Sequence, residues 1–154
     1  MSKTSFEEEI EKEGFLFYTN KGTSMLPLIK EGRDVLLIRR KNGRLKKYDI
    51  PLYKRENGHY VLHRVMKVRD NDYVLGGDNH YQMETGITDE QIIGVLTEII
   101  RDGRKVDLNS LKYRLYVFIW CRLFVFRIIY LKTRSIMHRI KRKIINCTNS
   151  GIFL

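Results

Sequence analysis

The chain has 154 residues, 43% of them hydrophobic, which is enough for one folded domain and too few for several. Two cysteines, Cys121 and Cys147, are too few for a disulfide framework, and residues 1–14 are too polar and acidic for a secretory signal peptide. The formal charge of +11 is concentrated in residues 111–154, which hold ten Lys and Arg and no acidic residue. This basic end favours an acidic partner, either anionic lipid or nucleic acid.

The first predicted element is a short helix over residues 5–13. Ser5 and Glu8 have the spacing of a capping box, in which each residue satisfies a backbone amide of the other. Gly14 is a suitable residue to end the helix.

Beyond Gly14 the sequence predicts a series of short strands separated by glycine-containing turns such as Asn42-Gly43 and Asp102-Gly103. The expected strands are Phe15–Tyr18, Val35–Arg40, Ile50–Lys54, Tyr60–Val68, Tyr73–Leu75 and Ile93–Ile100. Many short strands with such turns predict a mainly β, compact domain over residues 1–108.

The pattern changes near residue 109. Residues 115–131 are apolar except for Arg122 and Arg127, and a basic run follows over residues 132–143. We predict an apolar-basic helical tail over residues 109–145 and a disordered end over residues 146–154.

The tail is expected to associate with a membrane. Seventeen helical residues extend only about 25 Å, the short limit for a span. Two central arginines cost roughly 2.5–3.5 kcal/mol each, which nearly cancels the apolar contribution. We therefore expect the tail to lie at the cytoplasmic face of a membrane, with its basic end on anionic lipid.

Two alternatives to this placement stay open. One is an integral span through residues 115–131, and the other is a helix packed on the body or on a partner. Nucleic acid is disfavoured because the segment is too continuously apolar.

Two segments carry residues suited to nucleophilic catalysis. Ser24 lies in G-T-S-M-L-P, where Gly22 permits close backbone approach and Pro27 stiffens the chain after the serine. His63 lies in the strand-like segment Tyr60–Val65, on an otherwise apolar face. Near neutral pH, histidine is the side chain best suited to take a proton from a serine hydroxyl.

A third segment supplies carboxylates. Asp78 follows two glycines, and Glu84 lies six residues further on. Either carboxylate, placed behind His63, would hold its tautomer and stabilise the imidazolium. His59 and His80 lie close to His63 in sequence, but no cysteine or carboxylate spacing completes a zinc site, so we expect no metal and no other cofactor.

Taken in order, these segments resemble the signal peptidase family and its LexA-type relatives. Most bacterial members have lysine as the base, so a histidine at this place is similar to the endoplasmic-reticulum and archaeal-like branch. The matching motifs are S-M-L-P at 24–27, G-R-D-V-L at 32–36, Y-D-I at 48–50, H-R-V at 63–65 and G-D-N at 77–79.

The resemblance implies a compact signal-peptidase/LexA-like β-fold and a serine endopeptidase that cleaves a leader or signal-like segment from a precursor peptide or protein. Ser24 would be the nucleophile and His63 the base. Asp78, slightly preferred, or Glu84 would orient the base. The backbone at Gly22 and Thr23, with the Ser24 amide, would stabilise the oxyanion. The substrate would be extended, with small side chains near the cut.

Two other functions stay open from the sequence. A LexA-like self-cleaving regulator would need a DNA-binding segment, and the 14 residues that precede the first strand are too short for one. A non-catalytic basic module could bind a membrane or nucleic acid through residues 109–145.

Overall fold

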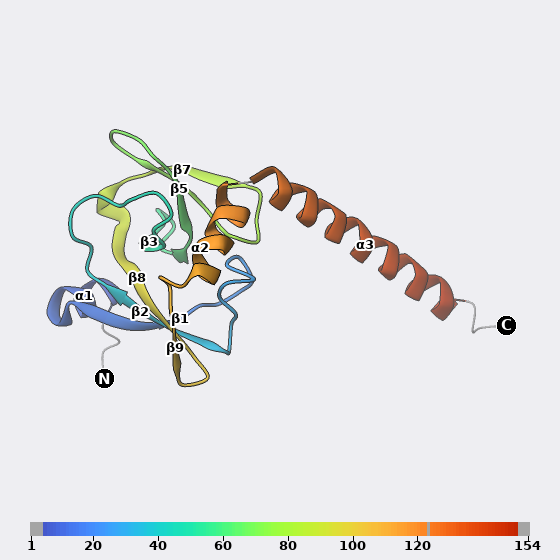
Figure 1. Ribbon diagram of the computed structural model, residues 1–154, viewed down its shortest axis with the longest axis horizontal. Helices are drawn as coiled ribbons and strands as arrows, with labels where there is room; N and C mark the ends of the chain where they lie inside the picture. Colours follow the sequence, from blue (N-terminus) through green and yellow to red (C-terminus); the bar gives the residue numbers. More distant parts are fainter. Residues whose placement is uncertain (1–4, 123, 151–154) are drawn as a thin grey trace.

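The computed structural model describes residues 5–122 and 124–150. It has a mainly β body with a short helix at its N-terminal side and a helical C-terminal segment, as the sequence predicted (Figure 1). The strands are β1 Phe15–Thr19, β2 Asp34–Arg39, β3 Pro51–Lys54, β4 Tyr60–Leu62, β5 Arg64–Val68, β6 Tyr73–Gly76, β7 Met83–Ile87, β8 Ile92–Arg101 and β9 Arg104–Val106. The helices are α1 Phe6–Glu13, a 3₁₀ turn Asp89–Gln91, α2 Leu111–Val117, a π-helical turn Phe118–Arg122 and α3 Phe124–Ser150.

The predicted helix at residues 5–13 is confirmed as α1, including its two ends. The Glu8 amide donates to Ser5 Oγ at 3.2 Å, and the Ser5 amide donates to Glu8 Oε2 at 3.1 Å. Gly14 ends the helix with a φ of 77°, a left-handed conformation that glycine adopts without steric cost. Ile10 is the buried residue that anchors α1 to the body.

The strands form two antiparallel sheets. The larger follows the order β1-β2-β8-β3-β4, with β9 paired to β8, and the smaller follows the order β5-β6-β7. The predicted strand over residues 60–68 is divided at His63, because β4 pairs with β3 whereas β5 pairs with β6 in the other sheet. His63 therefore lies where the chain passes from one sheet to the other.

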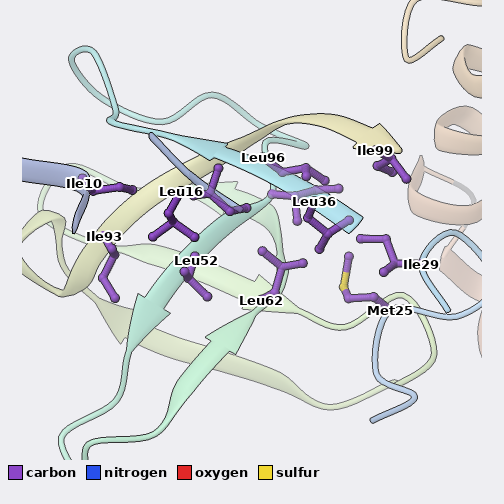
Figure 2. Close-up of a cluster of buried hydrophobic side chains, with 12 residues drawn as sticks. Ile10, Leu16, Met25, Ile29, Leu36, Leu52, Leu62, Ile93, Leu96 and Ile99 are labelled. Atoms are coloured by element: carbon purple, nitrogen blue, oxygen red, sulfur yellow. The ribbon is translucent and has the colours of Figure 1, made fainter. Parts of the chain in front are cut away.

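Two groups of apolar side chains form the core. The larger group lies under the six-stranded sheet, and Figure 2 shows Met25 and Ile29 at the end of this group near Ile99, with Ile10 and Ile93 at the other end. The second group packs around strands of the smaller sheet and includes Tyr53, Val65, Tyr73 and Leu75. The residues that follow Ser24 are thus part of the main core.

The six predicted strands all correspond to observed ones, but two strands were missed. β7 (METGI) is mostly exposed or half-buried, so it lacks the alternation of apolar residues that identifies a strand in sequence. β9 is only three residues long and mostly exposed. The missed β7 matters because it carries Glu84.

The C-terminal segment is divided in two. α2 and the π-helical turn lie against the body, and α3 projects from it on the side away from α1 (Figure 1). The predicted boundary at residue 109 therefore does not separate the body from the tail. Of the end predicted to be disordered, residues 146–150 continue α3, and residues 151–154 lie outside the described part. Among the described helices, none combines the length and apolarity needed to cross a membrane.

Candidate active site

Ser24 opens a tight turn between β1 and β2. The Leu26 amide donates to the Thr23 carbonyl at 3.2 Å, and the Ile29 amide donates to the Met25 carbonyl at 2.9 Å. Met25 and Ile29 are fully buried in the core, whereas Ser24 is half-buried. The two buried side chains hold the turn in place, so Ser24 sits on a rigid support at the edge of the body.

Gly22 shapes the approach to Ser24. Its φ of 86° is left-handed, which favours glycine at this position. Its amide donates to Glu31 Oε2 at 2.8 Å, and its carbonyl accepts from Asn20 Nδ2 at 3.3 Å. Because its amide is already engaged by Glu31, Gly22 acts through the shape of the turn.

The far end of the same turn is held by Asp34, the aspartate of the G-R-D-V-L motif. Its carboxylate accepts from the Lys30 amide at 2.8 Å and from Arg101 Nε at 2.8 Å. Arg101 Nη2 also donates to the Leu28 carbonyl at 2.8 Å. Burial opposes the charge of Asp34, but hydrogen bonds from Arg33 and Arg101 hold its pKa well below the usual value. Asp34 therefore stays ionised and fixes the turn.

The Y-D-I motif secures the chain beside His63. The Tyr48 amide donates to the Val65 carbonyl, and the Val65 amide donates to the Asp49 carbonyl, both at 2.8 Å. The His63 amide faces the Pro51 carbonyl at 3.4 Å. These bonds fix the backbone on both sides of the histidine at the junction of the sheets.

Gly77 marks the point where nucleophile and base come together. A Cβ built on Gly77 would lie 3.2 Å from the Ser24 Cβ and 3.2 Å from His63 Nε2. It would also lie 2.7 Å from the Ser24 carbonyl oxygen, which accepts from the Asn79 amide at 2.8 Å. Ser24 Cβ and His63 Nε2 thus both lie close to Gly77, and a side chain at this position would crowd both groups.

Glu84 lies behind His63, on the side away from Ser24. Its Oε1 is 3.2 Å from His63 Nδ1, and the Tyr53 hydroxyl is also 3.2 Å from that nitrogen. Arg55 binds the carboxylate through two nitrogens of its guanidinium group. Nε donates to Glu84 Oε2 at 2.9 Å, and Nη2 donates to Glu84 Oε1. His63 therefore has Glu84 at Nδ1, while Nε2 is the ring nitrogen near Gly77 and Ser24.

The electrostatics of this group keep His63 neutral. The pKa of His63 is lowered to about 4, chiefly by burial and in part by the charge of Arg55, whereas the charge of Glu84 acts in the opposite direction. Burial also acts to raise the pKa of Glu84, but hydrogen bonds from Arg55 and Tyr53 outweigh it and leave that pKa lowered. At neutral pH the site holds a neutral imidazole next to a carboxylate.

Asp78, the slightly preferred orienting acid, is engaged elsewhere. Its carboxylate accepts from Arg64 Nε at 2.9 Å and from Arg64 Nη2 at 2.7 Å, and both side chains are fully buried. It also accepts from the Tyr116 hydroxyl at 2.8 Å, and its carbonyl accepts from Trp120 Nε1 at 2.8 Å. Asp78 therefore holds the loop and the C-terminal segment together, and Glu84 is the carboxylate beside His63.

Sequence reasoning missed Arg55, Tyr53 and Arg64. Arg64 stands next to His63 in the H-R-V motif, but nothing close to it in sequence indicates that its partner is Asp78. Arg55 and Tyr53 have no local signal, because their contacts with Glu84 and His63 join residues that are far apart in the chain.

Ser24, His63 and Glu84 line a single cavity of about 1280 Å³. One wall is formed by β1 through Phe17, Tyr18 and Thr19, and others by β4, His80 and residues 82–84. His59 and His80 also line the cavity, and the rings of His63 and His80 are 6.5 Å apart. In the described part of the chain, no three His, Cys, Asp or Glu side chains are grouped so as to hold a metal ion.

The geometry defines a candidate Ser-His-Glu site on a mainly β body. No protein-family model matches the chain, and neither the curated proteins nor the solved structures contain a significant match. The assignment of a function therefore rests on the motifs and on the geometry of the site.

Proposed function

We propose that this protein is a serine endopeptidase of the signal peptidase type, with Ser24 as nucleophile, His63 as general base and Glu84 as the residue that positions the base. The observation that carries the proposal is the arrangement around Gly77. A serine and a neutral, buried histidine lie close to this glycine in one cavity, and a carboxylate contacts the far nitrogen of the ring. The five ordered motifs that resemble the family all lie at this site or hold it in place.

The proposed reaction proceeds through an acyl-enzyme. A proton on His63 Nδ1, favoured by Glu84, leaves the Nε2 lone pair directed toward Ser24. Ser24 Oγ attacks the scissile carbonyl while Nε2 takes the hydroxyl proton and then donates it to the leaving amine. Water, activated in the same way, releases the acyl group and regenerates Ser24. The Ser24 amide, with that of Thr23 beside it, stabilises the oxyanion.

The proposed substrate is the leader or signal-like segment of a precursor peptide or protein. β1 ends the order of the larger sheet, so its outer edge is available to an extended chain. Tyr18 and Thr19 of this strand line the cavity that holds Ser24. A peptide added along β1 would therefore run into the site.

We also propose that α3 attaches the enzyme to the cytoplasmic face of an anionic membrane. Ile136, Met137 and Ile140 are all more than half exposed on this helix, and basic residues flank them. An amphipathic helix of this kind lies in the lipid interface with its apolar side chains inserted. The enzyme would then meet precursors that are themselves bound to the membrane.

Labelling with a fluorophosphonate probe tests the catalytic proposal. The intact protein should react covalently at Ser24, and the Ser24→Ala and His63→Ala variants should lose the label together with peptide cleavage. Thr23→Ala, a neighbouring hydroxyl, is the matched control and should retain both. Labelling that persists in Ser24→Ala would contradict the proposal. Cleavage confined to the chain itself would favour a self-cleaving regulator, and absence of labelling and cleavage would favour a binding module.

A further inference from the structure

A second recess adjoins the active site. It has a volume of about 580 Å³ and lies between the loop Asn79–Gln82 and α3, from which Arg134, Arg139 and Arg142 contribute to its wall. Arg134 Nη1 donates a long hydrogen bond of 3.4 Å to Asn79 Oδ1, which joins the helix to the loop. We refer to this feature as the arginine recess.

The arginine recess continues the active-site cavity. His80 and Gln82 line both spaces, so the loop Asn79–Gln82 is the common wall between them. The same loop follows Gly77, which lies beside Ser24 and His63. A peptide that leaves the active site past this loop therefore enters the recess within a few residues of the scissile bond.

The recess has a strongly positive lining. Three of its side chains are arginines, and no Asp or Glu lines it. The guanidinium group is planar and presents paired donors that match a carboxylate, so arginine is well suited to binding acidic side chains. All 18 acidic residues of the chain lie in residues 1–110, which leaves α3 without acidic residues of its own.

The arginine recess differs from the surface proposed to contact lipid. Met137 and Ile140 line a different groove of α3, together with Tyr130, and Arg134 is the one described residue that lines both this groove and the recess. The spacing of Arg139 and Arg142 places them away from that apolar stripe on the helix. Because the recess is walled by a loop and opens toward the active site, an extended peptide fits it better than a flat bilayer does.

We infer that the arginine recess binds acidic side chains of the substrate, so that the enzyme prefers precursors with Asp or Glu a few residues from the cleavage site. The inference rests on the proposed peptidase function and deepens it by naming a substrate class. The acidic segment would increase the affinity for the substrate and align the scissile bond with Ser24. Ser24, His63 and Glu84 would carry out the reaction.

Two measurements test the inference separately from the peptidase proposal. The first is binding of fluorescent peptides to the Ser24→Ala full chain at low salt, using one peptide with an Asp/Glu cluster and one with Asn/Gln in the same places. The second is cleavage of the same peptides by the intact protein, with the cluster placed before or after the cut. The acidic peptide should bind and react roughly five- to tenfold better, and added salt should remove the difference.

A pair of double variants localises the effect. Arg139→Gln/Arg142→Gln should remove the preference for the acidic peptide and leave cleavage of the neutral peptide unchanged. Lys132→Gln/Lys141→Gln removes the same charge from the same helix outside the recess and should keep the preference. Equal binding of both peptides by the Ser24→Ala chain would overturn the inference even if the intact protein cleaves them. Loss of binding to phosphatidylglycerol vesicles in the arginine variant, with peptide preference unaltered, would make the recess a lipid site and would also overturn it.

Discussion

His63 is buried to 94%, its exposed fraction being 6%, yet it must gain a proton during the proposed reaction. Burial keeps the resting ring neutral, which is the state that a general base needs. Glu84 compensates by stabilising the imidazolium once it forms. Arg55 in turn keeps Glu84 ionised and in place, although its own charge disfavours the protonated ring.

These opposing charges predict the pH dependence of kcat/KM. Because the pKa of His63 is lowered to about 4, activity should fall only near that pH and not at the usual histidine value of 6.5. Arg55→Gln removes a positive charge that lowers this pKa, so the acid limb should move to higher pH. Glu84→Gln removes the charge that raises it, so the acid limb should move to lower pH, and kcat should fall roughly tenfold or more.

Asp78→Asn serves as the control for these variants, with turnover and urea unfolding measured for each. It should lower stability, on the order of 3–5 kcal/mol, because it leaves Arg64 buried without its ionic partner. Its acid limb should move to lower pH by less than that of Glu84→Gln, because the charge of Asp78 raises the pKa of His63 less than the charge of Glu84 does. An acid limb that shifts with Asp78→Asn and not with Glu84→Gln would reverse the roles assigned to the two carboxylates.

We predict that turnover requires glycine at position 77, because a side chain there would crowd Ser24 and His63. The Cβ of Gly77→Ala would lie 2.7 Å from the Ser24 carbonyl oxygen, so the loop or the nucleophile turn would have to move. A displacement of this kind should lower kcat by roughly a hundredfold. Gly103→Ala, where a Cβ meets nothing within 4 Å but φ is 74°, should cost backbone strain of about 1–2 kcal/mol and leave kcat unchanged. Steady-state kinetics and thermal unfolding of both variants test this prediction. Normal turnover by Gly77→Ala would show that glycine is not required at this position.

Among the elements, α2 and the π-helical turn are part of the body. Tyr116 and Trp120 donate to Asp78, and Arg64 Nη1 donates to the Tyr113 hydroxyl at 3.2 Å. These bonds cover the buried ion pair of Arg64 and Asp78. Because the Asn79 amide next to that pair bonds to the Ser24 carbonyl, this segment supports the loop that faces the nucleophile.

Two truncations should therefore behave differently. A chain ending at Arg122 keeps the cover over the ion pair and should retain its stability and its cleavage of a short neutral peptide. A chain ending at Asn109 exposes Arg64 and Asp78 and should lose on the order of 2–5 kcal/mol of stability. Its turnover should also fall, because the loop that faces Ser24 loses its support. Urea unfolding and peptide hydrolysis compare the two. Equal stability of both chains would show that residues 111–122 are dispensable for the body.

The molecule as a whole has a mixed-charge body and a basic helix that extends from it (Figure 1). Residues 1–110 nearly balance 19 basic residues with 18 acidic ones, so most of the net charge comes from residues 111–154. This division agrees with the proposed attachment, in which one end of the molecule contacts an anionic surface and the candidate active site stays accessible.

Flotation with lipid vesicles tests this attachment. The intact protein should bind anionic vesicles and not neutral ones, because each basic residue near such a surface contributes about 1 kcal/mol. Met137→Ser/Ile140→Ser should weaken binding by removing apolar side chains that enter the interface. Salt should release the protein. Binding to neutral and anionic vesicles alike, resistant to salt and carbonate, would instead indicate an integral span.

Local sequence was sufficient for the features that depend on near neighbours. The capping box of Ser5 and Glu8 joins residues three apart, and the glycine turns and short strands follow from backbone preferences over a few residues. The ordered motifs identified Ser24 and His63 as candidates because each motif carries its own residue types. A mainly β fold and both helical ends could be predicted for the same reason.

The remaining features depend on contacts between residues far apart in the chain. The sequence slightly favoured Asp78 over Glu84, whereas the placement of Glu84 beside His63 follows from the pairing of β6 with β7 and from the partner of Asp78, which is Arg64. The division of residues 60–68 at His63 arises because the two halves pair with strands of different sheets. Likewise, the apolar residues from Tyr113 to Trp120 could have faced lipid or protein, and their hydrogen bonds with the buried ion pair place this part of the tail on the body. Pairing partners, and not local preference, determine each of these outcomes.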